Sequence, residues 1–463
     1  MPKQHSVNPA TGEIVASYEL HTHVEVQQRL QCVARATHAW PTTTINRRAN
    51  LLRDLAALLR RDKATLALQI CDEMGKPISE ARAELEKCAS ALEYYAEHGP
   101  ALLENVAIAS DALESFVAWR PLGALLAIMP WNYPYWQVIR CLAPALLAGN
   151  VVLLKHAPNV TGCAFALERL LREAGAPEGV LTCFVVDEAQ VAQLIADERV
   201  HAVTLTGSSK AGAAVARLAG QALKKTVLEL GGSDAFVVCA DADVAAAAAC
   251  AVRSRYQNAG QSCIAAKRFL IDRRVYDEFL THLTTGVEAL RMGDPREDAT
   301  TVGPLARHDL RAVLADQVER ARVAGAQVHL GGHSVEGPGY FYEPTILTEV
   351  TEQMSVAREE VFGPVASLFR VEDVEAAVHI ANASGYGLSA TLWTTDLDRA
   401  KRLAARLQVG AVFINGLVKS DPRLPFGGVK QSGYGRELGF LGMHEFLNAQ
   451  TVWLSSGAEL RAH

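Results

Sequence analysis

Residues 202–212 read Ala-Val-Thr-Leu-Thr-Gly-Ser-Ser-Lys-Ala-Gly, and this stretch decides the fold. The first five residues are apolar or β-branched, which predicts a buried strand. Gly207 and Gly212 then frame a turn into a helix that continues past Ala213. Such a turn brings backbone N–H groups to a helix N-terminus, where a phosphate can bind. The spacing Gly-x-x-x-x-Gly is weak evidence by itself because it differs from the Rossmann Gly-x-Gly-x-x-Gly. The absence of a Gly-Lys-Ser/Thr ending argues against a P-loop nucleotide hydrolase.

Short apolar runs continue on both sides of this stretch. They alternate with helix-like segments, which is the pattern of parallel strands in βαβ units. The first series lies at 124–129, 151–154, 180–186, 202–206, 226–230 and 235–238. The second series lies at 268–271, 327–330, 390–393 and 411–414, with helices near 274–290, 307–324, 371–383 and 396–407. We therefore predict an α/β protein with two Rossmann-like parallel-sheet domains.

Two helices and two extended segments stand outside these series. One helix covers the leucine-rich run near 49–59 and stops before Gly75-Lys76-Pro77; the next follows it and ends at Gly99-Pro100. Residues 107–119 resemble an extended hairpin, and 451–454 a short terminal strand. Because an exposed strand edge is a liability unless it is paired, this strand is expected to pair within the chain or with a partner subunit.

These patterns predict the domain limits. Residues 1–106 and 120–230 would form a dinucleotide-binding domain, and residues 231–440 a catalytic domain. Residues 107–119 and 441–463 would form a small β-arm used for oligomerisation.

Composition narrows the class of protein. The chain has 463 residues and a formal net charge of −6, with no basic run, which argues against a nucleic-acid partner. No apolar stretch is long enough to cross a membrane, and the N-terminus lacks a secretory signal. The nine cysteines include no Cys-x-x-Cys pair and no spacing typical of a metal site. We expect free thiols, a cytoplasmic location and no metal.

A thiol, a carboxylate and an amide each stand in a distinctive string. Cys263 ends the small polar run Gln257-Asn258-Ala259-Gly260-Gln261-Ser262-Cys263, which can expose a thiol. Glu229 lies between two leucines and precedes two glycines, and Asn132 lies between two prolines. Taken singly, such residues are more often a buried filler, a turn residue and a loop residue. Together they supply the nucleophile, base and amide donor of acyl chemistry through a thioester.

Seven motifs occur in one order along the chain. They are Pro130-Trp131-Asn132, Lys155, Thr206-Gly207-Ser208 with Gly212, Glu229-Leu230-Gly231-Gly232, Gly260-Gln261-Ser262-Cys263, Glu359-Glu360-Val361-Phe362-Gly363-Pro364 and Pro425-Phe426-Gly427-Gly428-Val429-Lys430-Gln431-Ser432-Gly433. In these motifs the chain resembles the aldehyde dehydrogenase superfamily, from about residue 6 to residue 455. The resemblance implies an NAD(P)-dependent enzyme that oxidises an aldehyde to a carboxylic acid.

The resemblance also implies a role for each matching residue. Cys263 is the nucleophile, Glu229 is the base that activates the deacylating water, and Asn132 donates to the oxyanion. The implied cofactor-binding residues are Trp131, Lys155, Gly207, Ser208, Gly212, Glu360 and Phe362. From the residues alone, Lys155 could equally be a solvated strand end.

One departure from the family pattern concerns the cofactor. Pro158 stands where relatives commonly carry a Glu that accepts hydrogen bonds from both ribose hydroxyls of NAD. Without that carboxylate, a 2′-phosphate meets no repulsion, so NADP stays open. We expect modest selectivity with NAD slightly favoured.

The substrate prediction depends on Arg140. Its plain interpretation is a surface or interface ion pair. In succinate-semialdehyde dehydrogenases, however, an Arg at the matching place binds the distal carboxylate of the substrate. The segments 95–100, 127–132 and 154–160 look closest to the bacterial branch of that group, the Sad type. The predicted substrate-binding residues are Arg140, Trp136, Gln257, Ser420 and Arg423. Gln257 replaces a second Arg found in other members, so glutarate semialdehyde and uncharged aldehydes should also be tolerated.

Other functions remain open at this stage. A broad-specificity aldehyde dehydrogenase for uncharged aldehydes is one, and a catalytically silent dinucleotide-binding protein of the same fold is another. In related enzymes, strands like those of the arm join across subunits, which implies a homodimer or homotetramer.

Overall fold

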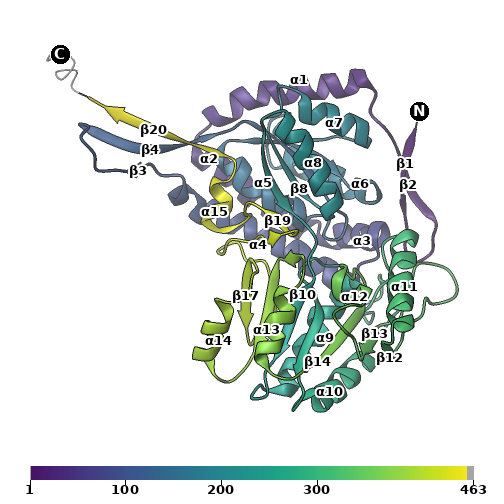
Figure 1. Ribbon diagram of the computed structural model, residues 1–463. Helices are drawn as coiled ribbons and strands as arrows, with labels where there is room; N and C mark the ends of the chain where they lie inside the picture. Colours follow the sequence, from purple (N-terminus) through teal and green to yellow (C-terminus); the bar gives the residue numbers. More distant parts are fainter. Residues whose placement is uncertain (1, 456–463) are drawn as a thin grey trace.

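The computed structural model describes residues 2–455, which form two lobes and a protruding arm (Figure 1). Each lobe is built on a sheet of mainly parallel strands, as the alternation of apolar runs predicts. Among the described residues, no helix is both long and apolar enough to span a bilayer.

Within residues 2–455, the first lobe contains a six-stranded sheet in the order β19-β9-β8-β5-β6-β7. All neighbours are parallel except β19, which runs antiparallel to β9. The strands are β5 (Ala124–Met129), β6 (Val151–His156), β7 (Leu181–Cys183), β8 (Ala202–Thr206), β9 (Lys225–Glu229) and β19 (Gly433–Tyr434). The helices of this lobe are α1 (His23–Ala39), α2 (Ile45–Arg61), α3 (Lys63–Met74), α4 (Ile78–Leu102), α5 (Trp136–Ala148), α6 (Thr161–Glu173), α7 (Glu188–Ala196) and α8 (Ser209–Gln221), with 3-10 turns η1 (Trp40–Thr42) and η2 (Pro158–Val160).

The second lobe contains, in the same part of the chain, a seven-stranded sheet in the order β12-β13-β14-β11-β10-β16-β17. Its strands are β10 (Asp234–Val238), β11 (Ala266–Asp272), β12 (Gln327–Leu330), β13 (Thr345–Thr348), β14 (Val365–Val371), β16 (Ser389–Trp393) and β17 (Ala411–Ile414). The helices are α9 (Val244–Tyr256), α10 (Tyr276–Glu288), α11 (His308–Val323), α12 (Ser355–Arg358), α13 (Val374–Asn382) and α14 (Leu397–Ala404), with η3 (Gln257–Gly260). Two short antiparallel sheets pair β1 (Lys3–Val7) with β2 (Ile14–Glu19), and β15 (Tyr386–Gly387) with β18 (Val429–Lys430).

The arm is a third, three-stranded sheet in the order β20-β4-β3. It consists of β3 (Val106–Ala107), β4 (Glu114–Pro121) and β20 (Leu447–Leu454), and α15 (Gly439–His444) lies at its base. The terminal strand therefore pairs within the chain, antiparallel to β4. In Figure 1 these strands extend away from both lobes. Residues 456–463 of the expected arm segment lie outside the described residues.

Helix α4 differs from its predicted end, because it passes through Gly99 and Pro100 and continues to Leu102. A proline inside a helix has no N–H to donate to the carbonyl four residues earlier. Here that carbonyl belongs to Ala96, and Arg53 Nη2 on α2 donates to it at 3.1 Å. The helix continues because a neighbouring helix supplies the missing hydrogen bond.

The second sheet also contains strands that the apolar pattern did not predict. These are β13 and β14, and the pairing of β12 with β13 is antiparallel. Buried Ser367 and exposed Arg370 interrupt the apolar run of β14. These two residues lie in a strand because β14 pairs in parallel with the neighbouring strand β11.

The order of the first sheet fixes where a ligand can bind. Strand β5 comes first in the chain and lies inside the sheet; β6 and β7 are added on one side of it, and β8 and β9 on the other. The crevice at the carboxyl ends of strands where the order reverses is the usual ligand site of such sheets. The loops after β5 and β8 carry Trp131, Asn132 and Gly207 to this edge.

Candidate active site

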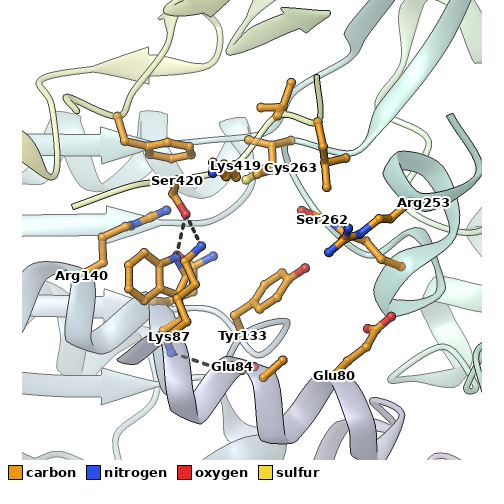
Figure 2. A pocket seen from close by; sticks show the side chains of 18 residues that line it. Glu80, Glu84, Lys87, Tyr133, Arg140, Arg253, Ser262, Cys263, Lys419 and Ser420 are labelled. Atoms are coloured by element: carbon orange, nitrogen blue, oxygen red, sulfur yellow. Dashed lines mark hydrogen bonds between the residues drawn. The ribbon is translucent and has the colours of Figure 1, made fainter. Parts of the chain in front are cut away.

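A cavity of about 510 Å³ lies between the two lobes at Cys263. Figure 2 shows its lining side chains, which come from α4, from α5 and the loop before it, and from the second lobe. The lining residues include Glu80, Glu84, Lys87, Tyr133, Trp136, Gln137, Arg140, Arg253, Gln257, Ser262, Cys263, Lys419, Ser420 and Phe426. The cavity thus joins a thiol with several cationic and hydroxyl groups.

Cys263 lies in the loop between η3 and β11 and is partly exposed. The turn before this loop, η3, contains two non-glycine residues in the left-handed region, Asn258 with φ +54° and Ala259 with φ +51°. Such a conformation persists only where the surroundings hold it. The loop itself is held by the buried ammonium of Lys267, which donates to the carbonyls of Ser262 at 2.8 Å and of Cys263 at 2.6 Å. Burial raises the pKa of the Cys263 thiol to about 12, against the opposing effects of Arg140 and Lys267.

Asn132 lies beside the cysteine loop. Its Nδ2 donates to the carbonyl of Gln261 at 3.0 Å, and Asn258 Nδ2 donates to the Asn132 carbonyl at 2.9 Å. Within residues 2–455, the backbone N–H of Cys263 donates to no group. A free N–H at the thiol and a side-chain amide in the adjoining loop are the donor types of an oxyanion hole.

Glu229 ends β9 and is buried, although it is not among the residues that line the cavity. Within the described part of the chain, neither carboxyl oxygen has a hydrogen-bond partner. Burial raises the pKa of this carboxyl well above its ordinary value, and the nearby Glu437 raises it further, whereas Arg140 and Arg436 lower it. An unpaired buried acid near a candidate nucleophile is typical of a functional proton acceptor.

Arg140 reaches the cavity from α5 but is already engaged. Its buried guanidinium forms an ion pair with Glu437, donates to Thr206 Oγ1 at 3.2 Å and lies over the Phe426 ring at 4.7 Å. Arg140 therefore satisfies a carboxylate in a buried pair, where the plain interpretation was a surface or interface pair, and the same side chain also lines the cavity.

The other predicted substrate-binding residues fall into two groups. Trp136, Gln257 and Ser420 line the cavity. Arg423 does not, because its exposed side chain pairs with Asp421 at 2.6 Å. Lys87 on α4 lines the cavity and was missed by the sequence reasoning. The available signal was a lysine next to buried Cys88 and three residues after buried Glu84 on the same helix.

The turn after β8 has the geometry expected for a phosphate. Ser208 caps α8 by accepting from Ala211 N at 3.2 Å, which leaves first-turn N–H groups without partners inside the helix. A Cβ at Gly207 would meet no atom closer than 3.5 Å, so the turn is open. A Cβ at Gly212 would lie 2.6 Å from the methyl groups of Leu230, so α8 packs closely there and a larger residue would displace that side chain.

The remaining predicted cofactor residues lie around the same edge. Lys155 is at the carboxyl end of β6, where burial lowers its pKa and Glu188 partly opposes the shift. Pro158 is exposed at the start of η2. The rings of Trp131 and Phe362 meet edge to face with centroids 5.8 Å apart, which joins the two lobes. This donor set of helix N–H groups and a strand-end lysine fits a dinucleotide.

Glu360 is fixed by one hydrogen bond and one nearby cation. It accepts from Gly232 N at 2.9 Å and lies 3.8 Å from Lys267 Nζ. Among the described residues, there is no group of three His, Cys, Asp or Glu side chains placed to hold a metal ion.

The fold and the site together define an oxidoreductase that handles aldehydes through a thiol. The chain belongs to the aldehyde dehydrogenase family, whose sequence profile matches residues 2–452. It is 49% identical to the succinate semialdehyde dehydrogenase [NAD(P)+] Sad of Escherichia coli strain K12, over 97% of each chain.

Two further relatives agree with this placement. A probable succinate-semialdehyde dehydrogenase [NADP(+)] of Synechocystis is 46% identical and covers 97% of this chain and 99% of its own. Succinic semialdehyde dehydrogenase from Streptococcus pyogenes, solved in complex with NADP+, superposes with a TM-score of 0.96 at 36% identity. That alignment covers 98% of this chain and 100% of the other.

Proposed function

We propose that the protein oxidises succinate semialdehyde, and with lower preference glutarate semialdehyde, to the carboxylic acid with NAD or NADP. The observation that carries the proposal is one cavity lined by Cys263 together with the cationic side chains of Lys87 and Arg140. A thiol and nearby cations in one cavity suit an aldehyde that carries a distal carboxylate. The names of the similar proteins support the same substrate.

The first step of the proposed mechanism is addition of Cys263 Sγ to the aldehyde carbon. The alkoxide that forms is stabilised by the Asn132 amide and the Cys263 N–H. A nicotinamide dinucleotide, if held beside Cys263 by Trp131, Phe362 and Glu360, would supply the acceptor for the hydride that this carbon loses. The product of the step is a thioester on Cys263.

The second step is hydrolysis of that thioester. Glu229 takes a proton from water as the water attacks the carbonyl, and the C–S bond breaks so that Cys263 leaves as the thiolate. The raised pKa of Glu229 suits a base that must accept a proton near neutral pH. Release of the carboxylate product returns the thiol.

The proposed cofactor site is the edge formed by Lys155, Pro158, Gly207, Ser208 and Gly212. The relatives' names include NAD(P)+ and NADP(+), and they give no support for the slight preference for NAD that the sequence led us to expect. We therefore propose that both cofactors are used. Trp131, Phe362 and Glu360 would hold the nicotinamide end between the lobes.

The test is a panel of kcat/KM values. Succinate semialdehyde, glutarate semialdehyde, butanal and benzaldehyde are each measured with NAD and with NADP. We expect succinate semialdehyde to exceed butanal by at least about tenfold, which is about 1.4 kcal/mol. A wild type that prefers butanal would instead be a broad-specificity enzyme, and one that turns over none of the four would be catalytically silent.

We also propose that the arm joins a second copy of the chain in a homodimer or homotetramer located in the cytoplasm. Exposed apolar residues on the arm support the assembly, among them Leu113 at 74% and Trp453 at 48%. Nine free thiols support a reducing compartment. In this scheme residues 1–106 and 120–230 bind the dinucleotide and residues 231–440 carry the nucleophile.

A further inference from the structure

Lys87 carries a half-buried charge that no acidic side chain pairs with in residues 2–455. Its ammonium donates to Ser420 Oγ at 2.7 Å and lies 4.2 Å from the centre of the Trp136 ring (Figure 2). Within residues 2–455, it forms no ion pair with a carboxylate. Buried charges in proteins are normally paired, because an unpaired one loses its hydration without compensation. This end of the cavity therefore lacks an anion.

The charged side chains Arg140 and Glu84 near Lys87 already form ion pairs with other residues. The guanidinium of Arg140 is paired with Glu437. Glu84, on the same helix as Lys87, is paired with Lys76 and also accepts from the backbone N–H groups at the start of α5. Arg253 and Lys419 also line the cavity and form no ion pair within residues 2–455, but both are exposed, whereas Lys87 is half-buried and stays free to meet an incoming carboxylate.

Ser420 adds a second donor. Its Oγ accepts from two groups, Lys87 Nζ at 2.7 Å and Trp136 Nε1 at 3.0 Å. A hydroxyl oxygen has two acceptor positions and one O–H donor, so both acceptor positions are filled and the proton remains. Ser420 lines the cavity, where this O–H can be given to an anion.

We propose that Lys87 and the Ser420 hydroxyl form the subsite that binds the distal carboxylate of the substrate, with Arg140 as a flanking charge that Glu437 largely neutralises. The inference rests on the proposed semialdehyde activity and names the group that confers it. Trp136 orients both donors through its indole N–H and its ring face. Lys87 is thus a specificity residue on the first lobe, reached from a helix that carries none of the family motifs.

A pH dependence supports the same assignment. Burial lowers the pKa of Lys87 to about 8; Arg140 on α5 lowers it further, and Cys88, Glu84 and Asp421 act in the opposite direction. Above this pH the amine loses its charge. Affinity for the carboxylate should then fall, whereas KM for an uncharged aldehyde should not follow this titration.

The test compares three single variants of the full-length enzyme. Lys87→Met removes the charge and keeps much of the side-chain volume, and Lys87→Arg keeps the charge. Lys419→Met is the matched control, because Lys419 lines the same cavity but is exposed. KM and kcat are measured for succinate semialdehyde and butanal from pH 6.5 to 9.5, and succinate binding to the NADP-loaded enzyme is measured by titration calorimetry.

We expect Lys87→Met to raise KM for succinate semialdehyde by at least about tenfold, to change butanal kinetics by less than about twofold, and to weaken succinate binding. Lys87→Arg should restore much of the affinity and move its loss to higher pH. Retained butanal turnover verifies that the variant is folded.

Other outcomes separate the two proposals. Equal losses for both substrates, or equal effects of Lys87→Met and Lys419→Met, would overturn the assignment of Lys87. If Lys87→Met does not fold, a Lys87→Arg variant with unchanged pH dependence would overturn it as well. If wild type does not prefer the semialdehyde but Lys87→Met still weakens succinate binding, the proposed function fails and the anion subsite stands.

Discussion

At the scale of single residues, the reactivity of Cys263 is set by burial more than by its neighbours. Burial raises the thiol pKa to about 12, while Arg140 and Lys267 lower it. The thiolate is the nucleophile. At pH values below the pKa, the thiolate fraction increases about tenfold for each unit by which the pH rises.

The first prediction concerns this thiol. Alkylation of Cys263 by iodoacetamide in the cofactor-free protein should still accelerate between pH 7 and 10, because the thiol remains mostly protonated there. Mass spectrometry of the Cys263 peptide measures the rate. Cys263→Ala gives the background from Cys32 and Cys250, which are also partly exposed. A plateau below about pH 9 would contradict a raised pKa.

Glu80 is a carboxyl group with a raised pKa that contacts the turn before the cysteine loop. It lines the cavity and accepts from the backbone N–H of Asn258 at 2.7 Å. Burial raises its pKa from an ordinary 4.5 to about 7, although Lys76, Arg253 and the Asn258 N–H lower it. The folded protein therefore holds a proton on Glu80 at pH values where the unfolded chain has released it.

The second prediction follows from the sign of this shift. Between pH 4.5 and 7 unfolding releases a proton, so rising pH lowers the stability of the wild type; outside this window Glu80 has no further effect. Glu80→Gln is neutral throughout. We expect the Tm of the wild type, relative to the variant, to fall from pH 5 to 8 in thermal unfolding monitored by circular dichroism. A difference that is constant with pH would refute the raised pKa.

At the scale of elements, α4 depends on a hydrogen bond from outside the helix. Arg53 on α2 donates to the Ala96 carbonyl that Pro100 leaves without a partner. The two helices pack against each other, so the donor is held in place.

The third prediction is that Arg53→Met lowers the free energy of unfolding by about 0.5–1.5 kcal/mol, the usual net contribution of one hydrogen bond. Urea unfolding provides the measurement. Arg47→Met is the control, because Arg47 is exposed on the same helix and its side chain makes no contact of this kind. Equal effects of the two substitutions would mean that the bond to Ala96 contributes nothing specific.

Elements differ in how well the sequence foretold them. Strands β5, β8 and β17 have the predicted bounds because each is a continuous run of apolar or β-branched residues with clear limits; β12 also has its predicted bounds, although polar and apolar residues alternate in it. Strand β14 was not foreseen, because Ser367 breaks the run and is buried only by its neighbours. The end of α4 was misplaced because Gly99-Pro100 ends most helices, and the compensating donor lies 43 residues earlier in sequence than its acceptor.

At the scale of the whole molecule, the arm is the part that packs on neither sheet. Strands β4 and β20 pair along eight residues, so the arm is internally bonded. Its large apolar side chains remain exposed, including Ile108, Leu113 and Trp453. A clustered exposed apolar surface on an edge sheet is typical of a subunit interface.

The fourth prediction is that wild type sediments as a dimer or tetramer at micromolar concentration. The double variant Leu113→Glu with Trp453→Glu should shift it toward a monomer of about 50 kDa, the mass of one chain. Val313→Glu, an equally exposed apolar position on α11, should leave the assembly unchanged. A wild-type monomer would remove the proposed role of the arm.

The sequence by itself determined the two-sheet α/β fold and the family, because apolar periodicity and motif order are local properties that each short segment carries alone. It also placed Cys263, Glu229 and Asn132 as one chemical set, since each has a distinctive string around it.

Only the tertiary structure decided which charges remain free at the cavity. Arg140 was the sequence's candidate for the carboxylate, but folding brings Glu437, almost three hundred residues later, against it. The same folding leaves Lys87, which no motif marks, beside Ser420 and Trp136 without an acidic partner among the residues that the structure describes. Whether a charge is paired depends on distances across the fold, and sequence spacing does not contain them.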